Sequence, residues 1–226
     1  MSADISAQMP PVGNQGSENS CVGWASGYAI QSYLVAQKQK WALGGGTGPN
    51  GINTSHVFSP AYIYNQINGG KDNGSIFSTA FSLLEKQGVA PWSFFPYVAG
   101  QFLKQPPASA VAAAAPYTIK TYYSIPTTNA GITQAKTYLT QGYPIFWGTE
   151  LDNIFEAGKF TILSGPFGTD EGGHAMTIVG YDDSMQAFKV MNSWGTNWEN
   201  SGFFWVSYSW VLNNPVMSDL YVLIDP

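Results

Sequence analysis

Apolar side chains recur at helical spacing in three segments of the first half of the chain. The first segment runs from Ser20, a suitable N-cap, to about Leu43, where Gly44 begins a run of three glycines that suits a helix end. A second helix is predicted over 59–67 and a third over 76–87. Glycine- and asparagine-rich turns separate the three segments, so the first half of the chain is predicted to be mainly helical.

The second half of the chain has the pattern of β-strands. β-branched and aromatic residues form short runs between turn residues. The predicted strands are 117–123, 145–148, 175–181, 187–191, 202–206 and 220–224, with one short helix over 133–140. Residues 91–116 are rich in proline and alanine and contain no confidently predicted element. Early helices and late strands favour an α+β fold with a helical lobe and a lobe built on a sheet or barrel.

Composition narrows the class of protein. The chain has 226 residues and a net charge of −5, which argues against nucleic acid as the main partner because phosphate binding needs a basic surface. Hydrophobic residues make up 44% of the chain, enough for a sizeable core, whereas charged residues make up only 10%, which mildly favours an exported enzyme. No window reaches the ~18 consecutive apolar residues of a membrane span. The chain start has no leader pattern, so we expect a secreted protein whose leader is absent from this chain, with a cytoplasmic location as the alternative.

The chain contains one cysteine, Cys21, and two histidines, His56 and His174. An intrachain disulfide is therefore impossible, and we expect no metal site and no cofactor. Cys21 falls at the start of the first predicted helix, where the helix dipole and free N–H groups lower the pKa of a thiol. Gln15 lies six residues upstream in a glycine-flanked loop and could donate to an oxyanion. From these residues alone, an inert buried cysteine and a surface glutamine are the simpler interpretation.

Two further motifs contain polar residues at strand ends. His174 stands at the head of an apolar strand, and Asn192 follows another strand in the block Asn-Ser-Trp-Gly-Thr-Asn-Trp. Taken singly, a core histidine and a turn asparagine explain them. Taken together, Gln15 and Cys21 at a helix start, Gly-His-Ala on a strand and the Asn-Ser-Trp-Gly block resemble the papain-like cysteine peptidases. The resemblance extends along most of the chain and is most specific in that block.

The resemblance implies a single two-lobed domain over 4–226. Its helical lobe covers about 4–115 and its antiparallel, β-barrel-like lobe about 116–226, with the active site in the cleft between them. It implies that Cys21 is the nucleophile and that His174 is the general acid and base. It also implies that Asn192 orients the imidazole and that Gln15 contributes to the oxyanion hole. The substrate-binding residues that it implies are Gly74, Ser75, Ile76, Phe77, Gly148, Gly173, Ala175, Trp194 and Trp198.

Within that group, Trp194 would shield the bond between His174 and Asn192 from water, and Trp198 would form the floor of the leaving-group side. The sequence departs from the family pattern beside the nucleophile. The residues before and after Cys21 read Glu18-Asn19-Ser20 and Val22, so Glu18 stands where the family has a disulfide cysteine and Val22 where it has an aromatic residue. A second departure is Glu199, which follows Trp198 where the family usually has glycine. None of these changes removes a catalytic atom.

The leading hypothesis is a thiol endopeptidase that acts through an acyl-enzyme on a peptide or protein substrate. A transferase or amidase on the same fold is the first alternative, because amines can also resolve an acyl-enzyme. A catalytically silent peptide- or carbohydrate-binding module is the second. An N-terminal propeptide or a protein inhibitor is a possible partner under the resemblance. No nucleic-acid partner is expected.

Overall fold

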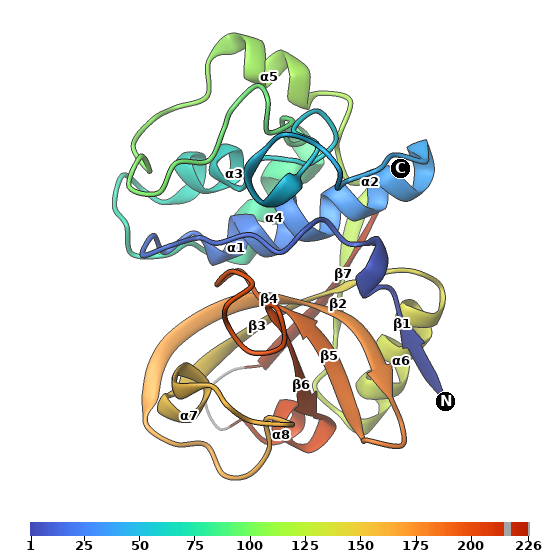
Figure 1. Cartoon of the computed structure of the whole chain (residues 1–226). Coiled ribbons are helices and arrows are strands. Elements are labelled where there is room, and N and C mark those ends of the chain that lie inside the picture. Colours follow the sequence, from blue (N-terminus) through green and yellow to red (C-terminus); the bar gives the residue numbers. More distant parts are fainter. Residues whose placement is uncertain (215–217, 226) are drawn as a thin grey trace.

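The computed structural model describes residues 1–214 and 218–225. Figure 1 shows two layers: α1 to α5 lie together above, and the strands lie below with α6, α7 and α8 around them. The helices are η1 (Ser6–Gln8), α1 (Cys21–Gly23), η2 (Trp24–Gln31), α2 (Ser32–Gln39), η3 (Pro49–Gly51), α3 (Pro60–Ile67), α4 (Phe77–Lys86), α5 (Ala108–Ala114), α6 (Asn129–Thr140), α7 (Asn153–Ala157) and α8 (Tyr208–Asn213). This arrangement confirms the predicted α+β class.

The strands form one antiparallel sheet. They are β1 (Ser2–Asp4), β2 (Thr121–Ile125), β3 (Ile145–Asp152), β4 (Asp170–Asp182), β5 (Ala187–Met191), β6 (Phe203–Ser207) and β7 (Ser218–Ile224). The order is β2-β7-β3-β4-β5-β6, and β1 pairs with β4. The predicted barrel-like closure is wrong: within the described residues β2 pairs only with β7 and β6 ladders only with β5, so the two end strands stay apart.

The element that carries Cys21 is one continuous helix of three parts, α1, η2 and α2, and its middle part is π-helical. Two glycines let α3 approach it closely. A Cβ at Gly23 would lie 2.5 Å from the carbonyl oxygen of Pro60, and a Cβ at Gly27 would lie 2.5 Å from Cδ1 of Ile63. Side chains larger than hydrogen at these two positions would push the helix away from α3.

The end of this helix differs from the prediction. The chain leaves the helix at Lys40, whose φ of 57° is left-handed, four residues before the glycine run that begins at Gly44. At the other end, Ser20 makes no side-chain capping hydrogen bond to the helix. Its hydroxyl instead lies 2.9 Å from the hydroxyl of Tyr97. Both helix ends are therefore set by contacts and backbone conformations that single-residue preferences do not reveal.

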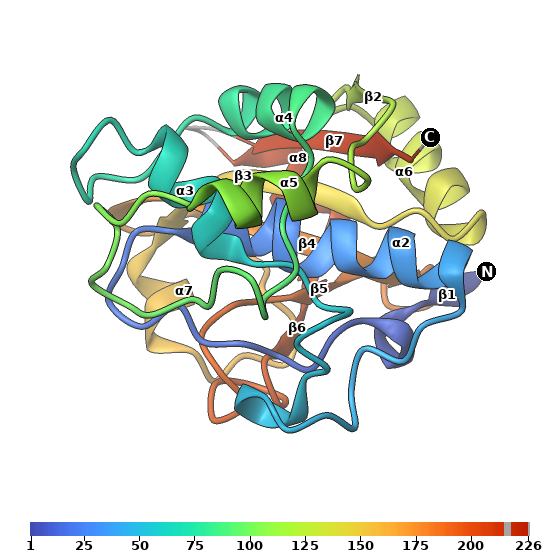
Figure 2. The same cartoon turned by 90° about the horizontal axis from the view of Figure 1, so that it is seen from above.

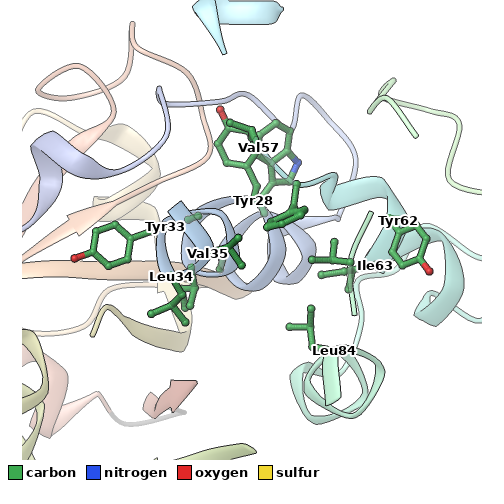
Figure 3. Close-up of a cluster of buried hydrophobic side chains, with 14 of the residues drawn as sticks. Tyr28, Tyr33, Leu34, Val35, Val57, Tyr62, Ile63 and Leu84 are labelled. Atoms are coloured by element: carbon green, nitrogen blue, oxygen red, sulfur yellow. The ribbon is translucent and has the colours of Figure 1, made fainter. Parts of the chain in front are cut away.

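Aromatic and aliphatic side chains fill the space between the helices. Figure 3 shows Tyr28 and Leu34 of the long helix in a cluster with Ile63 of α3 and Leu84 of α4. These side chains are buried. A second core lies on the sheet side and includes Trp147, which is fully buried. With no disulfide, the packing of these two cores is a main source of the stability of the fold.

The shorter elements agree with the predicted pattern only in part. The α3 helix begins as expected, since the hydroxyl of Ser59 accepts from the backbone N–H of Tyr62. Helix α5 lies within residues 91–116, a segment for which no element was assigned from the sequence. Helix α6 begins four residues earlier than predicted, because the side chain of Thr128 caps it. Strand β2 begins at Thr121 rather than at residue 117.

The two layers meet where the long helix crosses β4. Figure 2, turned by 90° from Figure 1, shows the long helix running across the strands. The hydroxyl of Thr177 on β4 donates to the backbone carbonyl of Ala25 at 3.3 Å. This contact lies four residues from the start of the helix and fixes that end against the sheet. None of the described helices is long and apolar enough to cross a membrane.

Candidate active site

Cys21 is the first residue of the long helix, and it lies against β4. Its side chain is 9% exposed. Three backbone N–H groups stabilise the thiolate form of Cys21: that of Ala175 on β4 and those of Val22 and Cys21 itself at the helix start. The helix start thus provides the polar environment that the sequence predicted.

His174 lies within β4, four residues after its start, and comes together with Asn192, which directly follows β5. His174 lies opposite Thr149 in the β3–β4 ladder and is 7% exposed. Its Nε2 lies 2.8 Å from Oδ1 of Asn192. The same Oδ1 accepts the backbone N–H of Ser193 at 2.8 Å, which establishes that it is an oxygen. Nε2 therefore carries the hydrogen, and Nδ1 is the nitrogen that can act as a base.

Gln15 is held in one orientation by its neighbours. Its Oε1 accepts from the hydroxyl of Ser193 at 2.7 Å, and its Nε2 donates to the backbone carbonyl of Glu18 at 2.9 Å. Its own backbone N–H donates to the carbonyl of Ser193 at 2.9 Å. The side-chain amide nitrogen of glutamine has two hydrogens, and one of them is in the hydrogen bond to the Glu18 carbonyl. The second hydrogen is available to a bound molecule.

Cys21, His174 and Gln15 line the same cavity, whose volume is about 260 Å³. The cavity is also lined by Gly16, Ser17, Glu18, Asn19, Leu151, Glu156, Glu171, Gly172, Gly173 and Trp194. A nucleophile, a base and an amide donor thus face one space, while Asn192 stands behind the base. Among the residues that the structure describes, no group of three or more His, Cys, Asp or Glu side chains is arranged to hold a metal ion.

Burial dominates the protonation of the two central groups. It raises the pKa of the Cys21 thiol, and the surrounding N–H groups lower it only in part. It also lowers the pKa of His174 to about 4, although the bond to Asn192 acts in the other direction. The sequence predicted an accessible, low-pKa thiolate at Cys21. That prediction is wrong for this structure, because the thiol is buried too deeply for the helix start to compensate.

Trp194 and Trp198 take different places. The ring of Trp194 lies 5.0 Å from that of His174 and covers it, as the resemblance implies. Trp198 packs behind Trp194 at 5.3 Å between ring centroids. It does not line the cavity around Cys21 but a neighbouring one of about 420 Å³, together with Glu199. Trp198 thus meets the cavity around Cys21 only through Trp194, and its place as the floor of the leaving-group side stays a prediction.

The remaining predicted substrate-binding residues lie in three places. Phe77, Gly148 and Ala175 lie together: Gly148 is opposite Ala175 in the sheet, and a Cβ at Gly148 would lie 3.7 Å from the ring of Phe77. Gly74, Ser75 and Ile76 precede α4 and do not line the cavity around Cys21. Gly173 does line it.

Sequence reasoning missed several residues that support the site. Ser193 fixes the amide of Gln15, and its place inside the Asn-Ser-Trp-Gly block is a signal that could have indicated this. Tyr97 donates to the carbonyl of Gln15 at 2.6 Å from a loop 82 residues away. Glu156 and Glu171 bring negative charge to the cavity. No sequence motif marks Glu156 or Glu171.

Comparisons with known proteins agree with one another. A family model described as "Papain family cysteine protease" matches residues 2–219. An uncharacterized peptidase C1-like protein of Acanthamoeba polyphaga mimivirus is 26% identical over 93% of this chain and 68% of its own length. The gamete and mating-type specific protein A of Dictyostelium discoideum is 26% identical over 92% of this chain, which spans only 43% of that protein.

Solved structures show the same fold. Xylellain, a cysteine protease from Xylella fastidiosa, has a TM-score of 0.82 and 25% identity, covering 100% of this chain and 86% of its own. The ragweed pollen allergen Amb a 11, a cysteine protease in its proform, has a TM-score of 0.77 and 18% identity, covering 100% and 66%. A Carica candamarcensis cysteine protease in complex with E-64 has a TM-score of 0.75 and 20% identity, covering 99% and 98%.

Proposed function

The chain belongs to the papain family of cysteine proteases, and from this premise we propose that it is a thiol endopeptidase acting through Cys21, His174, Asn192 and Gln15. In this proposal the substrate is an extended peptide or protein segment lying across the cavity at the start of the long helix. The acyl group becomes attached to Cys21 and is released by water.

One observation carries the proposal. The bond from Nε2 of His174 to Oδ1 of Asn192 leaves Nδ1 as the free basic nitrogen of a ring that lines the same cavity as Cys21. A neutral carboxamide behind the imidazole holds the ring in place without neutralising the charge that the ring gains during reaction. A buried structural histidine would have no need to share a cavity with the only thiol of the chain.

Acylation begins with a proton transfer from Sγ of Cys21 to Nδ1 of His174. The thiolate attacks the peptide carbonyl carbon, the C–S bond forms, and the carbonyl electrons move to oxygen. That oxyanion accepts two hydrogen bonds, one from the second N–H of the Gln15 side chain and one from the backbone N–H of Cys21. Since burial disfavours both charged groups, the ion pair is best formed as the substrate enters and not in the free enzyme.

The second half of the reaction restores the enzyme. As the C–N bond breaks, His174 gives its proton to the departing amine, which leaves on the His174 side of the cavity. His174 then takes a proton from water, the hydroxide attacks the thioester, and Cys21 regains its proton when the acid is released. Each proton that His174 accepts is returned, so no cofactor is required by this sequence of steps.

The test is covalent labelling with a peptidyl epoxide, followed by peptide mapping. We expect one label per chain, on Cys21, and loss of fluorogenic-peptide hydrolysis in proportion to labelling. Cys21→Ala should abolish both while the circular dichroism spectrum stays unchanged. Thr140→Ala, on the solvent side of α6, serves as the control. Hydrolysis at a near wild-type rate by Cys21→Ala would exclude Cys21 as the nucleophile.

The same assay separates hydrolysis from acyl transfer. With an added amine nucleophile, a hydrolase forms mainly the free acid, whereas a transferase forms mainly the amide. We further propose that an N-terminal propeptide or a protein inhibitor occupies the same cavity, since one solved structure of similar fold is a proform. Slow, reversible inhibition by such a segment, competitive with peptide substrate, would support this.

A further inference from the structure

The loop that precedes Cys21 is bound to a distant segment of the chain. The hydroxyl of Tyr97 donates to the carbonyl of Gln15 at 2.6 Å and lies 2.9 Å from the hydroxyl of Ser20. Three residues further along, the backbone N–H of Gly100 donates to Oε2 of Glu18 at 2.7 Å. Residues 97–100 therefore hold the loop 15–20 at both of its ends and in its middle.

Glu18 is the buried member of this arrangement. Its side chain is 2% exposed, although it belongs to a loop at the mouth of the cavity. Its second carboxylate oxygen, Oε1, has no hydrogen-bond partner among the described atoms. Burying a carboxylate costs free energy unless hydrogen bonds replace the lost water, and here only Oε2 has such a bond.

The backbone of Glu18 is connected directly to the oxyanion donor. Its carbonyl accepts from Nε2 of Gln15 at 2.9 Å and from the backbone N–H of Ser20 at 2.8 Å. The direction of that carbonyl thus sets the plane of the Gln15 amide. The side chain of the same residue, anchored at Gly100, sets the direction of the carbonyl.

We propose that Glu18 is a positioning residue, which holds the Gln15 amide in place for the oxyanion by tying its own peptide to Gly100. The inference rests on the proposed function, because it assigns a role within the same site. It does not make Glu18 a catalytic residue, since its carboxylate does not contact the reacting atoms. Asp72 supports the loop from the other side, accepting the backbone N–H of Asn19 at 2.8 Å.

The expected effect follows from this indirect action. Removing one oxyanion donor outright typically costs ~10²–10³-fold in rate. Glu18→Ala leaves Gln15 in place but releases the peptide at position 18 from Gly100, so the carbonyl that orients the Gln15 amide can turn. We therefore expect kcat to fall about tenfold with KM changed less than about twofold. Glu18→Gln keeps an acceptor for the N–H of Gly100 and should restore kcat to within about threefold of the wild type.

Two measurements separate positioning from a general loss of structure. The first is a double-mutant cycle: in a Gln15→Ala background, Glu18→Ala should no longer change kcat, because the donor it positions is absent. The second is the rate at which iodoacetamide alkylates Cys21. Alkylation needs the thiolate but no oxyanion hole, so Glu18→Ala should leave that rate within about twofold of the wild type.

The control is Asp4→Ala. Asp4 lies on β1, and its carboxylate also accepts a backbone N–H, that of Ser6. This substitution should change neither kcat nor the alkylation rate. If Glu18→Ala lowers kcat equally in both backgrounds, or lowers alkylation and turnover together, the inference is overturned. If Glu18→Ala does not fold, the double-mutant cycle is run with Glu18→Gln. A fall in kcat above tenfold in Glu18→Gln also overturns the inference. A wild type without turnover overturns the proposed function and this inference together.

Discussion

The two walls of the cavity are built in different ways. On the sheet wall, His174 is fixed by the β3–β4 ladder, in which Gly148 to Leu151 pair residue by residue with Ala175 to Gly172. On the helical wall, Gln15 lies in an irregular loop. It is held by two backbone carbonyls, those of Glu18 and Ser193, and by the hydroxyls of Ser193 and Tyr97. Backbone ladders survive most substitutions, whereas a loop held by side chains depends on each of them. The helical wall should therefore be the more easily disturbed half of the site.

The largest effect is expected on the sheet wall, at the reacting group itself. His174→Ala removes the base and should reduce turnover to background. Asn192→Ala leaves the base and removes only its orientation, so its cost should stay below the ~10⁴-fold known for a reversed histidine tautomer in a Ser-His-Asp site. The measurement is kcat/KM on one fluorogenic peptide. Equal losses in the two variants, with intact folds, would contradict a purely orienting role for Asn192.

The next effect is expected on the helical wall. Gln15→Ala should lower kcat by ~10²–10³-fold, with little change in the melting temperature. Ser193→Ala should cost about tenfold or less, since it only frees the Gln15 amide to turn. Steady-state kinetics on both variants gives the ranking. A larger loss in Ser193→Ala than in Gln15→Ala would contradict a role of the Ser193 hydroxyl that is limited to holding the Gln15 amide.

Acidification should change the contributions of the two walls to the free energy of unfolding in opposite directions. Burial lowers the pKa of His174 to about 4, below its ordinary 6.5, so the unfolded chain binds this proton first as the pH falls. The free energy of unfolding should then fall by about 2–3 kcal/mol between pH 7.5 and pH 4.5 on account of His174 alone. His174→Gln should lack this component. Urea denaturation of wild type and variant across that range measures it.

On the helical wall, Glu18 contributes to stability with a pH dependence opposite to that of His174. Burial raises the pKa of its carboxyl, so the folded chain binds this proton more readily than the unfolded chain. Its contribution to stability is therefore greatest at low pH and is lost as the pH rises through the folded pKa. Glu18→Gln should steepen the loss of stability on acidification. An unchanged loss would show that folding does not shift the pKa of Glu18, and a shallower loss would show that folding lowers it.

The smallest effect concerns charge. Glu156 and Glu171 line the cavity, and no lysine does. A peptide with lysine after the scissile bond should be cleaved roughly two- to fivefold faster than one with glutamate, because exposed charge pairs contribute little. The preference should weaken at high salt. Glu156→Gln should reduce it, whereas Glu85→Gln, on α4 and outside the cavity, should not.

Regular patterns in the sequence were enough for the larger elements. Strand β5 was predicted with its observed bounds, since four of the five residues of 187–191 are apolar and turn residues flank the run. Helices α5, α7 and α8 have five to seven residues, too few for a period of 3.6 to show. The end of the long helix could not be predicted, because left-handed backbone at a lysine such as Lys40 depends on tertiary contacts. Whether the sheet closes is likewise decided by contacts between distant strands.

The site was predictable only as a set of residues. Cys21 and His174 are 153 positions apart, so neither spacing nor periodicity brings them together, and the family resemblance alone did so. The supporting contacts remained hidden for a related reason. Glu18 meets Gly100 across 82 residues, and its burial follows from the closing of a loop that carries no motif. The raised pKa of Cys21 was missed because a helix start in the sequence predicts the electrostatic field of the helix dipole but not how deeply the thiol is buried.

The single cysteine makes the number of thiols per molecule equal to the number of proposed nucleophiles. A small alkylating reagent therefore counts free thiols directly: the fraction of mass-shifted protein gives the concentration of chains in which the proposed nucleophile is unmodified. Cys21→Ala, in turn, is a chain with no sulfhydryl at all. Cysteines introduced into it in pairs, one on each wall of the cavity, would be the only attachment points for spectroscopic probes. The distance between the walls could then be followed in solution while a peptide binds.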